Sequence, residues 1–311
     1  MKIGIYLENE PAAFDGGASS DYIKDFTPQK HQIVTFRRLV APHKVIWCRT
    51  EKSFLRALPI IDVAIVWQFS ERHLQRAPNL QLVATPAAGR EGIKLPAKHP
   101  GIKVYHGHFH GVLIAQTVLG ALLAMSRGLF SAQGQRWPRS SLSVRDIEGT
   151  NAVILGYGAI GRHIGRLLRQ FGVNVYGVRR RSGMGTYTMA DLPRLLRDCD
   201  HFIMALPSDT GTDGLVDGHI LSLLPRRARL YNVGRGNALD EAALLKALRT
   251  NRLAGAYLDV FAQEPLPDNS PLYGAPNLLL TPHASAFGTS YLDRFFSEFT
   301  QHLSQEFFNN D

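Results

Sequence analysis

Cysteine is scarce in this chain. Among 311 residues there are only two, Cys48 and Cys199, and they lie far apart in the sequence. They form neither a disulfide framework nor a Cys-x-x-Cys metal site, and a reducing, cytoplasmic compartment is the simplest interpretation. With 45% hydrophobic and 20% charged residues, the composition is that of an ordinary globular protein and excludes a disordered chain.

The chain also lacks a hydrophobic run long enough to cross a bilayer. Its most apolar stretch, residues 112–125, is interrupted by Gln116 and Thr117 and is shorter than a membrane span. Glu8 and Glu10 follow the first apolar residues so closely that the N-terminus does not resemble a signal peptide. We therefore expect a soluble cytoplasmic protein that does not bind a membrane.

Acidic residues are outnumbered by basic ones, 26 to 35, which gives a formal net charge of +9. Such a charge attracts anions, whether nucleic acids or small molecules. The arginines are dispersed, and no basic motif with interleaved aromatic residues accompanies them. We therefore expect a small anionic substrate and an anionic cofactor, and no nucleic-acid partner.

Short apolar segments alternate with turn-rich or helical segments along the chain, which is typical of parallel sheets covered by helices. A first series of strands is expected at residues 2–6, 45–47, 61–67, 80–85 and 103–105. A second series is expected at residues 151–155, 173–178, 201–205, 230–233, 255–259 and 278–280. Helices are expected at residues 111–127, 162–171, 191–197, 240–249 and 291–308. The pattern predicts an α/β protein with two Rossmann-like domains.

Pro100-Gly101 breaks the alternating pattern, and we expect the domain boundary near residue 100. We place a second domain at residues 101–283, inserted into a discontinuous first domain made of residues 1–100 and 284–311. The last helix returns to the first domain with an apolar face that includes Phe295, Phe296 and Phe299.

A glycine-rich loop, Gly156-Tyr157-Gly158-Ala159-Ile160-Gly161, follows the strand at residues 151–155. Its Gly-x-Gly-x-x-Gly spacing between a strand and a helix is that of a dinucleotide-binding turn. The first glycine allows the tight turn, the second lets the pyrophosphate approach the backbone, and the third lets the helix pack on the strand. Free N–H groups at the start of the helix face the phosphates. The alternative is a glycine-rich turn without a ligand. The cofactor residues expected here are Gly156, Gly158, Ala159, Ile160 and Gly161.

The next strand, residues 173–178, lacks the acidic residue that usually binds the ribose 2′-hydroxyl of NAD. Arg179, Arg180 and Arg181 stand there instead. A guanidinium binds a 2′-phosphate through paired hydrogen bonds, so we expect NADP(H) to be favoured over NAD(H). Arg179 and Arg180 are the better candidates, although any one of the three arginines alternatively belongs to a solvent-facing charge run.

Three polar residues that lie far apart in the sequence are candidates for catalysis: Arg235 in Asn-Val-Gly-Arg-Gly, Glu264 in Ala-Gln-Glu-Pro and His283 in Thr-Pro-His-Ala. They supply a permanent cation, a carboxylate and an imidazole. Hydride transfer to the keto group of a 2-oxo acid requires these groups, to hold the substrate carboxylate and to protonate the new hydroxyl. Taken singly, each has a structural alternative: a surface ion pair, a solvated turn acid and a loop histidine.

The glycine loop and residues 232–236, 258–266 and 281–283 together resemble the D-isomer-specific 2-hydroxyacid dehydrogenase family over about residues 80–290. The arginine triplet resembles its NADPH-preferring glyoxylate/hydroxypyruvate reductases. The resemblance implies that Arg235 holds the substrate carboxylate, that His283 is the general acid, and that Glu264 pairs with His283. It makes residues 101–283 the dinucleotide-binding domain and the remainder the substrate-binding domain.

The resemblance also assigns Leu206 and Pro207 to a cofactor-contact loop and places Val233 and Asp259 beside the nicotinamide. In the first domain it implies that backbone amides of Ala88 and Gly89 bind the substrate carboxylate. Residues 88–92 depart from the family's Gly-Val-Asp-like pattern, so substrate preference does not carry over. Arg90 either contacts the substrate or lies in solvent.

Some residues leave alternatives open. His106, His108 and His110 would share one face of a strand and so suggest a metal, but the chemistry requires none and we expect no metal. Trp137 either closes over a substrate or packs at a subunit contact. The helix at residues 111–127 is apolar enough to be buried either within the chain or in a dimer, and the resemblance implies a homodimer.

The leading hypothesis is an NADPH-linked reductase that converts a small 2-oxo acid, glyoxylate or hydroxypyruvate, into a D-2-hydroxy acid. One alternative is a phosphoglycerate-type dehydrogenase without a regulatory domain, and related members oxidise formate or phosphite. Another is an NAD(P)-sensing, corepressor-like protein with the same fold.

Overall fold

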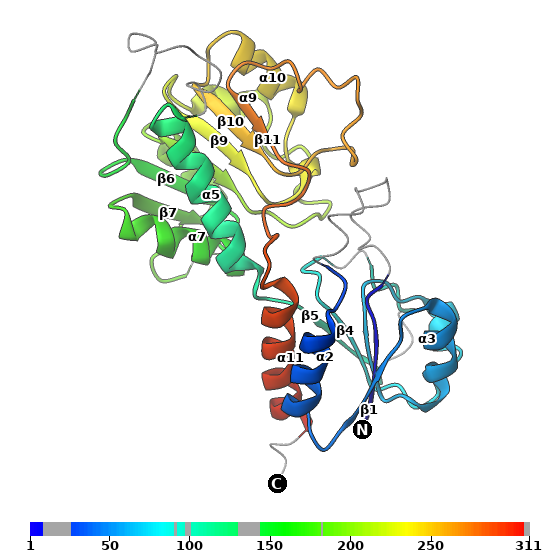
Figure 1. The fold of residues 1–311 in the computed structure, drawn as a ribbon. Helices are drawn as coiled ribbons and strands as arrows, with labels where there is room; N and C mark the ends of the chain where they lie inside the picture. The colour runs from blue at the N-terminus through cyan, green and yellow to red at the C-terminus, as the bar shows by residue number, and fades with distance from the viewer. Residues whose placement is uncertain (9–25, 90–91, 97–100, 130–143, 182, 308–311) are drawn as a thin grey trace. The chain divides into compact units, whose positions relative to one another are not determined.

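The computed structural model describes residues 1–8, 26–89, 92–96, 101–129, 144–181 and 183–307. The chain divides into two compact units, each with its own parallel sheet (Figure 1). The first unit comprises Met1–His110 and Phe287–Asp311, and the second comprises Gly111–Ala286. Because Phe287–Asp311 joins the N-terminal segment, the first unit is discontinuous in sequence.

The sheet of the first unit has the strand order β2-β1-β3-β4-β5, with every pairing parallel. The helices α2 and α11 lie side by side on one face of this sheet, and α3 lies on the other (Figure 1). Phe36 of α2 and Phe296 of α11 have ring centroids 4.7 Å apart, and Phe295 and Phe299 are also buried. The elements are β1 Lys2–Tyr6, α2 Lys30–Leu39, β2 Lys44–Trp47, α3 Glu51–Ala57, β3 Val63–Val66, α4 Glu71–Leu74, β4 Leu82–Thr85, β5 Lys103–His106 and α11 Tyr291–Phe307.

The sequence pattern placed residues 101–110 in the second domain, whereas β5 pairs with β4 in the first sheet, Lys103 opposite Leu82. The Pro100-Gly101 break therefore precedes an edge strand of the first sheet. The first unit extends to His110, where α5 begins.

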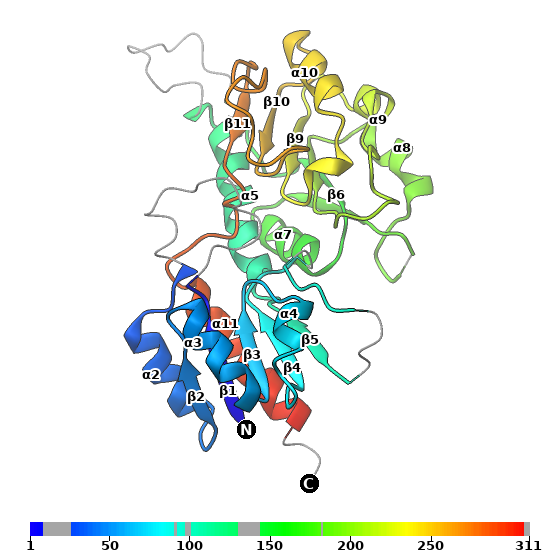
Figure 2. The same cartoon turned by 90° about the vertical axis from the view of Figure 1, so that its right-hand side faces the viewer.

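The sheet of the second unit has the order β11-β10-β9-β8-β6-β7 and is parallel throughout. Alternate side chains of each strand enter two different cores. Ile154 and Ile203 pack with α5 and α7, whereas Val153 and Phe202 pack with α8, α9 and α10 on the other face (Figure 2). The elements are α5 His110–Ser126, β6 Asn151–Leu155, α7 Ala159–Gln170, β7 Asn174–Val178, α8 Leu192–Leu196, β8 His201–Met204, α9 Gly218–Leu223, β9 Arg229–Asn232, α10 Glu241–Arg249, β10 Gly255–Leu258 and β11 Leu278–Leu280.

The two parallel sheets confirm the expected α/β, Rossmann-like fold. The largest difference at a functional position is the start of α7, which begins at Ala159 rather than at residue 162. Gly158 is the N-cap, and its carbonyl accepts a hydrogen bond from Arg162 N–H at 3.0 Å. The last glycine of the loop is thus already helical, which brings the free N–H groups of the helix into the loop itself.

The three alternating histidines do not share one strand. His106 ends β5, His108 lies in the following loop, and His110 begins α5. The backbone N–H of His108 donates to Glu298 at 2.8 Å, and His110 Nε2 lies 2.9 Å from the Tyr291 hydroxyl. Within the described residues, no three His, Cys, Asp or Glu side chains are grouped to hold a metal ion. In the same part of the chain, no helix combines the length and hydrophobicity needed to span a membrane.

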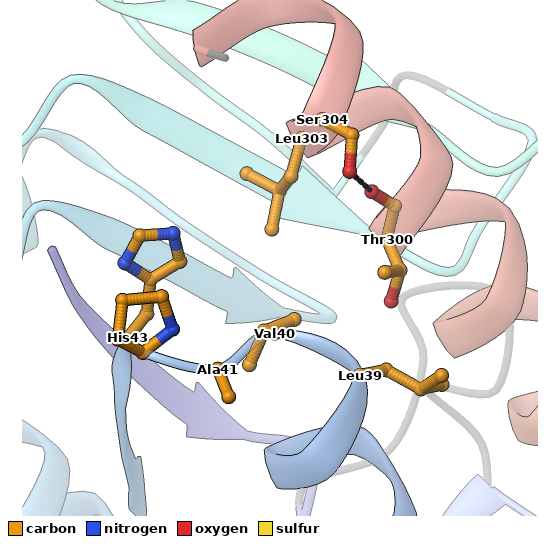
Figure 3. A pocket seen from close by; sticks show the side chains of 8 residues that line it. Leu39, Val40, Ala41, His43, Thr300, Leu303 and Ser304 are labelled. Carbon is orange, nitrogen blue, oxygen red and sulfur yellow. Dashed lines mark hydrogen bonds between the residues drawn. The ribbon is translucent and has the colours of Figure 1, made fainter.

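A small hollow of about 150 Å³ lies in the first unit beside the C-terminal end of α2 and the last turns of α11 (Figure 3). It lies beside His43, whose N–H donates to Val40 and which immediately precedes β2. This is the amino-terminal end of that strand, whereas ligands of open parallel sheets bind at the carboxyl ends. Its lining residues are Leu39, Val40, Ala41, Pro42, His43, Thr300, Leu303 and Ser304.

Candidate active site

The glycine loop leaves β6 at Gly156, and two of its three glycines are required by the protein itself. Gly156 has φ +96°, and a Cβ there would lie 2.5 Å from the carbonyl oxygen of Ala205. A Cβ on Gly161 would lie 2.4 Å from the carbonyl oxygen of Gly156. Gly158 differs, because a Cβ there would meet no atom within 4 Å. Its backbone borders open space at the N-terminus of α7, beside Ala159 and Ile160. Free N–H groups at such a helix N-terminus are able to bind phosphate groups.

The arginines expected at the cofactor ribose lie next to this loop. The N–H groups of Gly156 and Tyr157 donate to the carbonyl of Val178 at 3.1 and 3.0 Å. Arg179 and Arg180 follow Val178 directly, and both are exposed. The Nη2 of Arg180 lies 3.3 Å from Oδ2 of Asp209, a carboxylate that the sequence analysis did not single out. The turn sequence Ser-Asp-Thr-Gly after β8 is the signal that locates it.

The segments that follow β8 and β9 adjoin the same loop. A Cβ on Gly156 would lie 3.0 Å from Leu206 N, and one on Gly234 would lie 2.5 Å from that same atom. Pro207 is exposed beyond Leu206, whereas Val233 is 4% exposed. Leu206, Pro207 and Val233 therefore lie at the carboxyl edge of the second sheet, where open α/β folds bind their ligands.

Arg235 follows β9 and is held by its neighbours. Asn232, which is fully buried, accepts a hydrogen bond from Gly234 N–H at 3.1 Å and donates to the Arg235 carbonyl at 3.2 Å. The Nη1 of Arg235 donates to the carbonyl of Gly234 at 2.9 Å. A Cβ on Gly236 would lie 1.9 Å from the carbonyl carbon of Phe261. The Arg235 turn is therefore packed against the segment that leads to Glu264.

Glu264 and His283, which are 19 positions apart, meet directly. The Nδ1 of His283 lies 2.7 Å from Oε2 of Glu264, and the side chains keep 27% and 23% of their surface accessible. The other carboxylate oxygen of Glu264 accepts from the N–H of Phe261 at 2.9 Å. Each carboxylate oxygen of Glu264 therefore has its own partner, Phe261 N–H for Oε1 and the His283 imidazole for Oε2.

The ionisation of Glu264 follows from these contacts. Burial raises the pKa of the Glu264 carboxyl, but the hydrogen bond and charge of His283, the N–H of Phe261 and the charge of Arg235 outweigh it. The net result is a pKa below the ordinary value for glutamate. At neutral pH, Glu264 is therefore an ionised acceptor beside the imidazole.

Asp259 organises the backbone around His283. It is 1% exposed, and its Oδ1 accepts hydrogen bonds from Thr281 Oγ1 at 2.6 Å, Ala284 N–H at 2.7 Å and Ser285 N–H at 3.0 Å. The N–H of His283 donates to the Asp259 carbonyl at 2.8 Å. His283 itself has φ +52°, an uncommon conformation that this surrounding network holds in place. The family resemblance implies a place for Asp259 beside the nicotinamide; what the structure shows is that Asp259 shapes the His283 turn.

The residues expected to bind the substrate from the first domain lie after β4. Ala88 is exposed and Gly89 is half-buried, and the preceding Ala87 N–H donates to Thr85 Oγ1 at 3.2 Å. Arg90 and Trp137 lie outside the described residues.

Comparison with known proteins gives a consistent result. Residues 117–285 match the D-isomer specific 2-hydroxyacid dehydrogenase, NAD binding domain family. The chain is 33% identical over 231 residues to a glyoxylate reductase of Thermofilum pendens, covering 68% of each protein. It is 32% identical over 254 residues to a glycerate dehydrogenase of Methylorubrum extorquens, covering 76% of this chain and 79% of that protein. A crystal structure of a D-isomer specific 2-hydroxyacid dehydrogenase from Xanthobacter autotrophicus in complex with NADPH and MES has a TM-score of 0.75 and 26% identity, covering 98% of this chain and 95% of that one.

The chain therefore belongs to the D-isomer specific 2-hydroxyacid dehydrogenase family. It is an NAD(P)-dependent oxidoreductase of the class that acts on CH–OH groups. The family expected from the sequence motifs is confirmed.

Proposed function

We propose that this protein reduces a small 2-oxo acid, glyoxylate or hydroxypyruvate, to a D-2-hydroxy acid with NADPH in preference to NADH. The observation that carries this proposal is the 2.7 Å contact between His283 Nδ1 and Glu264 Oε2. The named relatives include a glyoxylate reductase and a glycerate dehydrogenase, which act on acids of this size. A reduced nicotinamide coenzyme, when bound, would supply the hydride for the substrate carbonyl carbon.

The hydrogen bond to Glu264 sets the roles of the two imidazole nitrogens. Because the ionised carboxylate only accepts hydrogen bonds, Nδ1 of His283 carries a proton and donates a hydrogen bond to Glu264. Nε2 is then the nitrogen that gives a proton to the developing alkoxide in reduction and takes one from the hydroxyl in oxidation. Glu264 stabilises the charged imidazole whenever both nitrogens are protonated.

Arg235 supplies the permanent positive charge of the site. Its guanidinium suits a substrate carboxylate because the two planar groups form paired hydrogen bonds. Arg179 and Arg180, next to the glycine loop, favour a coenzyme with a 2′-phosphate, and the Xanthobacter protein was crystallised with NADPH.

Coenzyme oxidation tests this proposal directly. Absorbance at the reduced-nicotinamide band is followed with NADPH and then NADH against glyoxylate, hydroxypyruvate and pyruvate. We expect His283→Gln to lower kcat by about 10²-fold or more while coenzyme binding persists. His219→Gln, an exposed histidine in the same unit, is the matched control and leaves kcat unchanged. Bound NADPH without turnover of any of the three acids, or full activity of His283→Gln, contradicts the proposal.

A further inference from the structure

The contact between Arg180 and Asp209 joins two loops of the second unit that carry opposite charges. Arg180 follows β7 and Asp209 follows β8, and Arg180 Nη2 lies 3.3 Å from Asp209 Oδ2. The side chains are 78% and 42% exposed, so the pair lies at the surface. Surface ion pairs of this kind are weak, which leaves Arg180 able to exchange Asp209 for another anion.

The loop that carries Asp209 holds its carboxylate in one position. Oδ1 of Asp209 accepts from the N–H of Gly211 at 2.9 Å, and the N–H of Asp209 donates to Thr212 Oγ1 at 3.1 Å. The buried Thr212 hydroxyl lies 2.9 Å from the carbonyl of Pro207. These bonds leave Oδ2 directed towards Arg180, so the carboxylate is the fixed partner and the arginine the movable one.

Gly211 provides the space in which Arg180 reaches this carboxylate. A Cβ on Gly211 would lie 3.2 Å from Arg180 Nη2 and 3.1 Å from Asp209 Oδ1. The arginine therefore extends over a position without a side chain. Among the described residues, the edge that carries Arg179 and Arg180 thus also contains the carboxylate of Asp209.

We propose that Asp209 limits the coenzyme discrimination of this enzyme, because its carboxylate competes with the coenzyme 2′-phosphate for Arg180 and repels it. The inference rests on the proposed function, in which Arg179 and Arg180 face that phosphate. A 2′-phosphate carries a charge of about −1.5 to −2 at neutral pH and is disfavoured beside an anion, whereas a neutral 2′-hydroxyl is not. Asp209 therefore weakens NADPH binding selectively and brings the two coenzymes closer in affinity.

Asp209→Asn tests this role with little change of shape. The asparagine oxygen still accepts from Gly211 N–H, so the loop keeps its hydrogen bonds while the charge beside Arg180 disappears. We expect NADP⁺ and adenosine 2′,5′-bisphosphate to bind about three- to tenfold more tightly, as for loss of one exposed charge contact. Binding of NAD⁺ and 5′-AMP should change less than twofold.

Asp213→Asn is the matched control, because this carboxylate lies in the same loop but pairs with Asn237 instead of an arginine. It removes the same charge and should leave the ratio of affinities unchanged. Arg180→Gln should weaken NADP⁺ binding. The gain in NADP⁺ affinity caused by Asp209→Asn should be smaller in the Arg180→Gln protein than in the wild type. Dissociation constants from calorimetric titration provide a readout that does not depend on turnover.

The possible results distinguish failure of the proposed role of Asp209 from failure of the proposed function. A ratio of NADP⁺ to NAD⁺ affinity that is unchanged or reduced in Asp209→Asn, with both coenzymes still bound, overturns the inference alone. An equal rise in Asp213→Asn also overturns it, because the effect then belongs to net charge. If the wild-type protein binds neither coenzyme, the proposed function fails and the inference fails with it.

Discussion

The backbone of Gly236 lies directly against the carbonyl group of Phe261. A Cβ at position 236 would lie 1.9 Å from both the carbon and the oxygen of that carbonyl, and neither is the movable end of a side chain. This contact links the turn that carries Arg235 to the segment that carries Glu264. The separation between the cation and the carboxylate of the site therefore depends on a residue without a side chain.

Gly236→Ala should consequently damage both stability and activity. The two segments must separate to admit the methyl group, which we expect to cost about 1–3 kcal/mol of unfolding free energy and to lower kcat/KM by about 10²-fold through misplacement of Arg235. Gly218→Ala is the control, since its Cβ would meet Ala243 at an ordinary 3.6 Å. Chemical denaturation and steady-state kinetics measure the two effects. Wild-type behaviour of Gly236→Ala would show that the contact is not restrictive.

The glycine loop predicts a contrast between two alanine substitutions. Gly158→Ala should leave the melting temperature unchanged, because the new Cβ enters open space, but should weaken coenzyme binding where the phosphates approach. Gly161→Ala should instead lower the melting temperature, because its Cβ would lie 2.4 Å from the carbonyl of Gly156. Thermal unfolding with and without coenzyme distinguishes them. If Gly158→Ala binds coenzyme normally, the pyrophosphate does not lie at that glycine.

Glu264→Gln keeps the shape of the side chain but removes the charge that stabilises the imidazolium. We expect kcat to fall by about 10²-fold, with coenzyme affinity retained. The pKa of Glu264 is depressed in the folded protein, so its contribution to stability is complete above the ordinary value of 4.5 and is lost as the pH falls through the folded value. The stability difference between wild type and Glu264→Gln, measured by urea unfolding, should therefore shrink on acidification. A difference that grows at low pH would contradict this sign.

His201 predicts a second pH dependence, away from the active site. Burial, aided by the charge of Arg229, lowers the pKa of His201 to about 4 from 6.5. Between these two pH values, His201 binds a proton in the unfolded chain but not in the folded protein. The contribution of neutral His201 to the free energy of unfolding is therefore fully present above pH 6.5. It falls as the pH drops towards 4, by up to about 1.4 kcal/mol per pH unit.

His201→Asn preserves a polar group near the Tyr231 hydroxyl, which lies 3.1 Å from His201 Nδ1. This variant should lose less stability than the wild type between pH 7 and pH 5. Urea unfolding at the two pH values measures the difference. An identical loss in both proteins would show that His201 does not titrate in this range.

Much of the fold followed from local sequence patterns. The strands at residues 2–6, 151–155 and 278–280 have the expected ends, because buried parallel strands are short apolar runs bounded by polar residues or glycine. The start of α7 was misplaced, since glycine was expected to precede the helix and not to lie within its first turn. Edge strand β5 was assigned to the second domain because strand partners are not encoded in the strand itself.

Some residues of the candidate site were also predictable from local sequence motifs, and others were not. Arg235, Glu264 and His283 were identified from motifs, because their chemical types and order are local properties of the chain. Asp209 was not identified, because its importance comes from a partner 29 positions away on a different loop. The hydrogen bonds that Asp259 makes to the His283 turn were likewise absent from any local pattern.

The sequence by itself determined the fold class, the dinucleotide-type loop and the identity of the residues proposed to carry the chemistry, because side-chain type and backbone propensity are local. Only the tertiary structure decided that His283 meets Glu264 through Nδ1, that Gly236 contacts Phe261, and that Arg180 has the Asp209 carboxylate beside it. The reason is physical. These contacts join segments that a parallel sheet brings together at its carboxyl edge, and their distances depend on how the strands are ordered and packed.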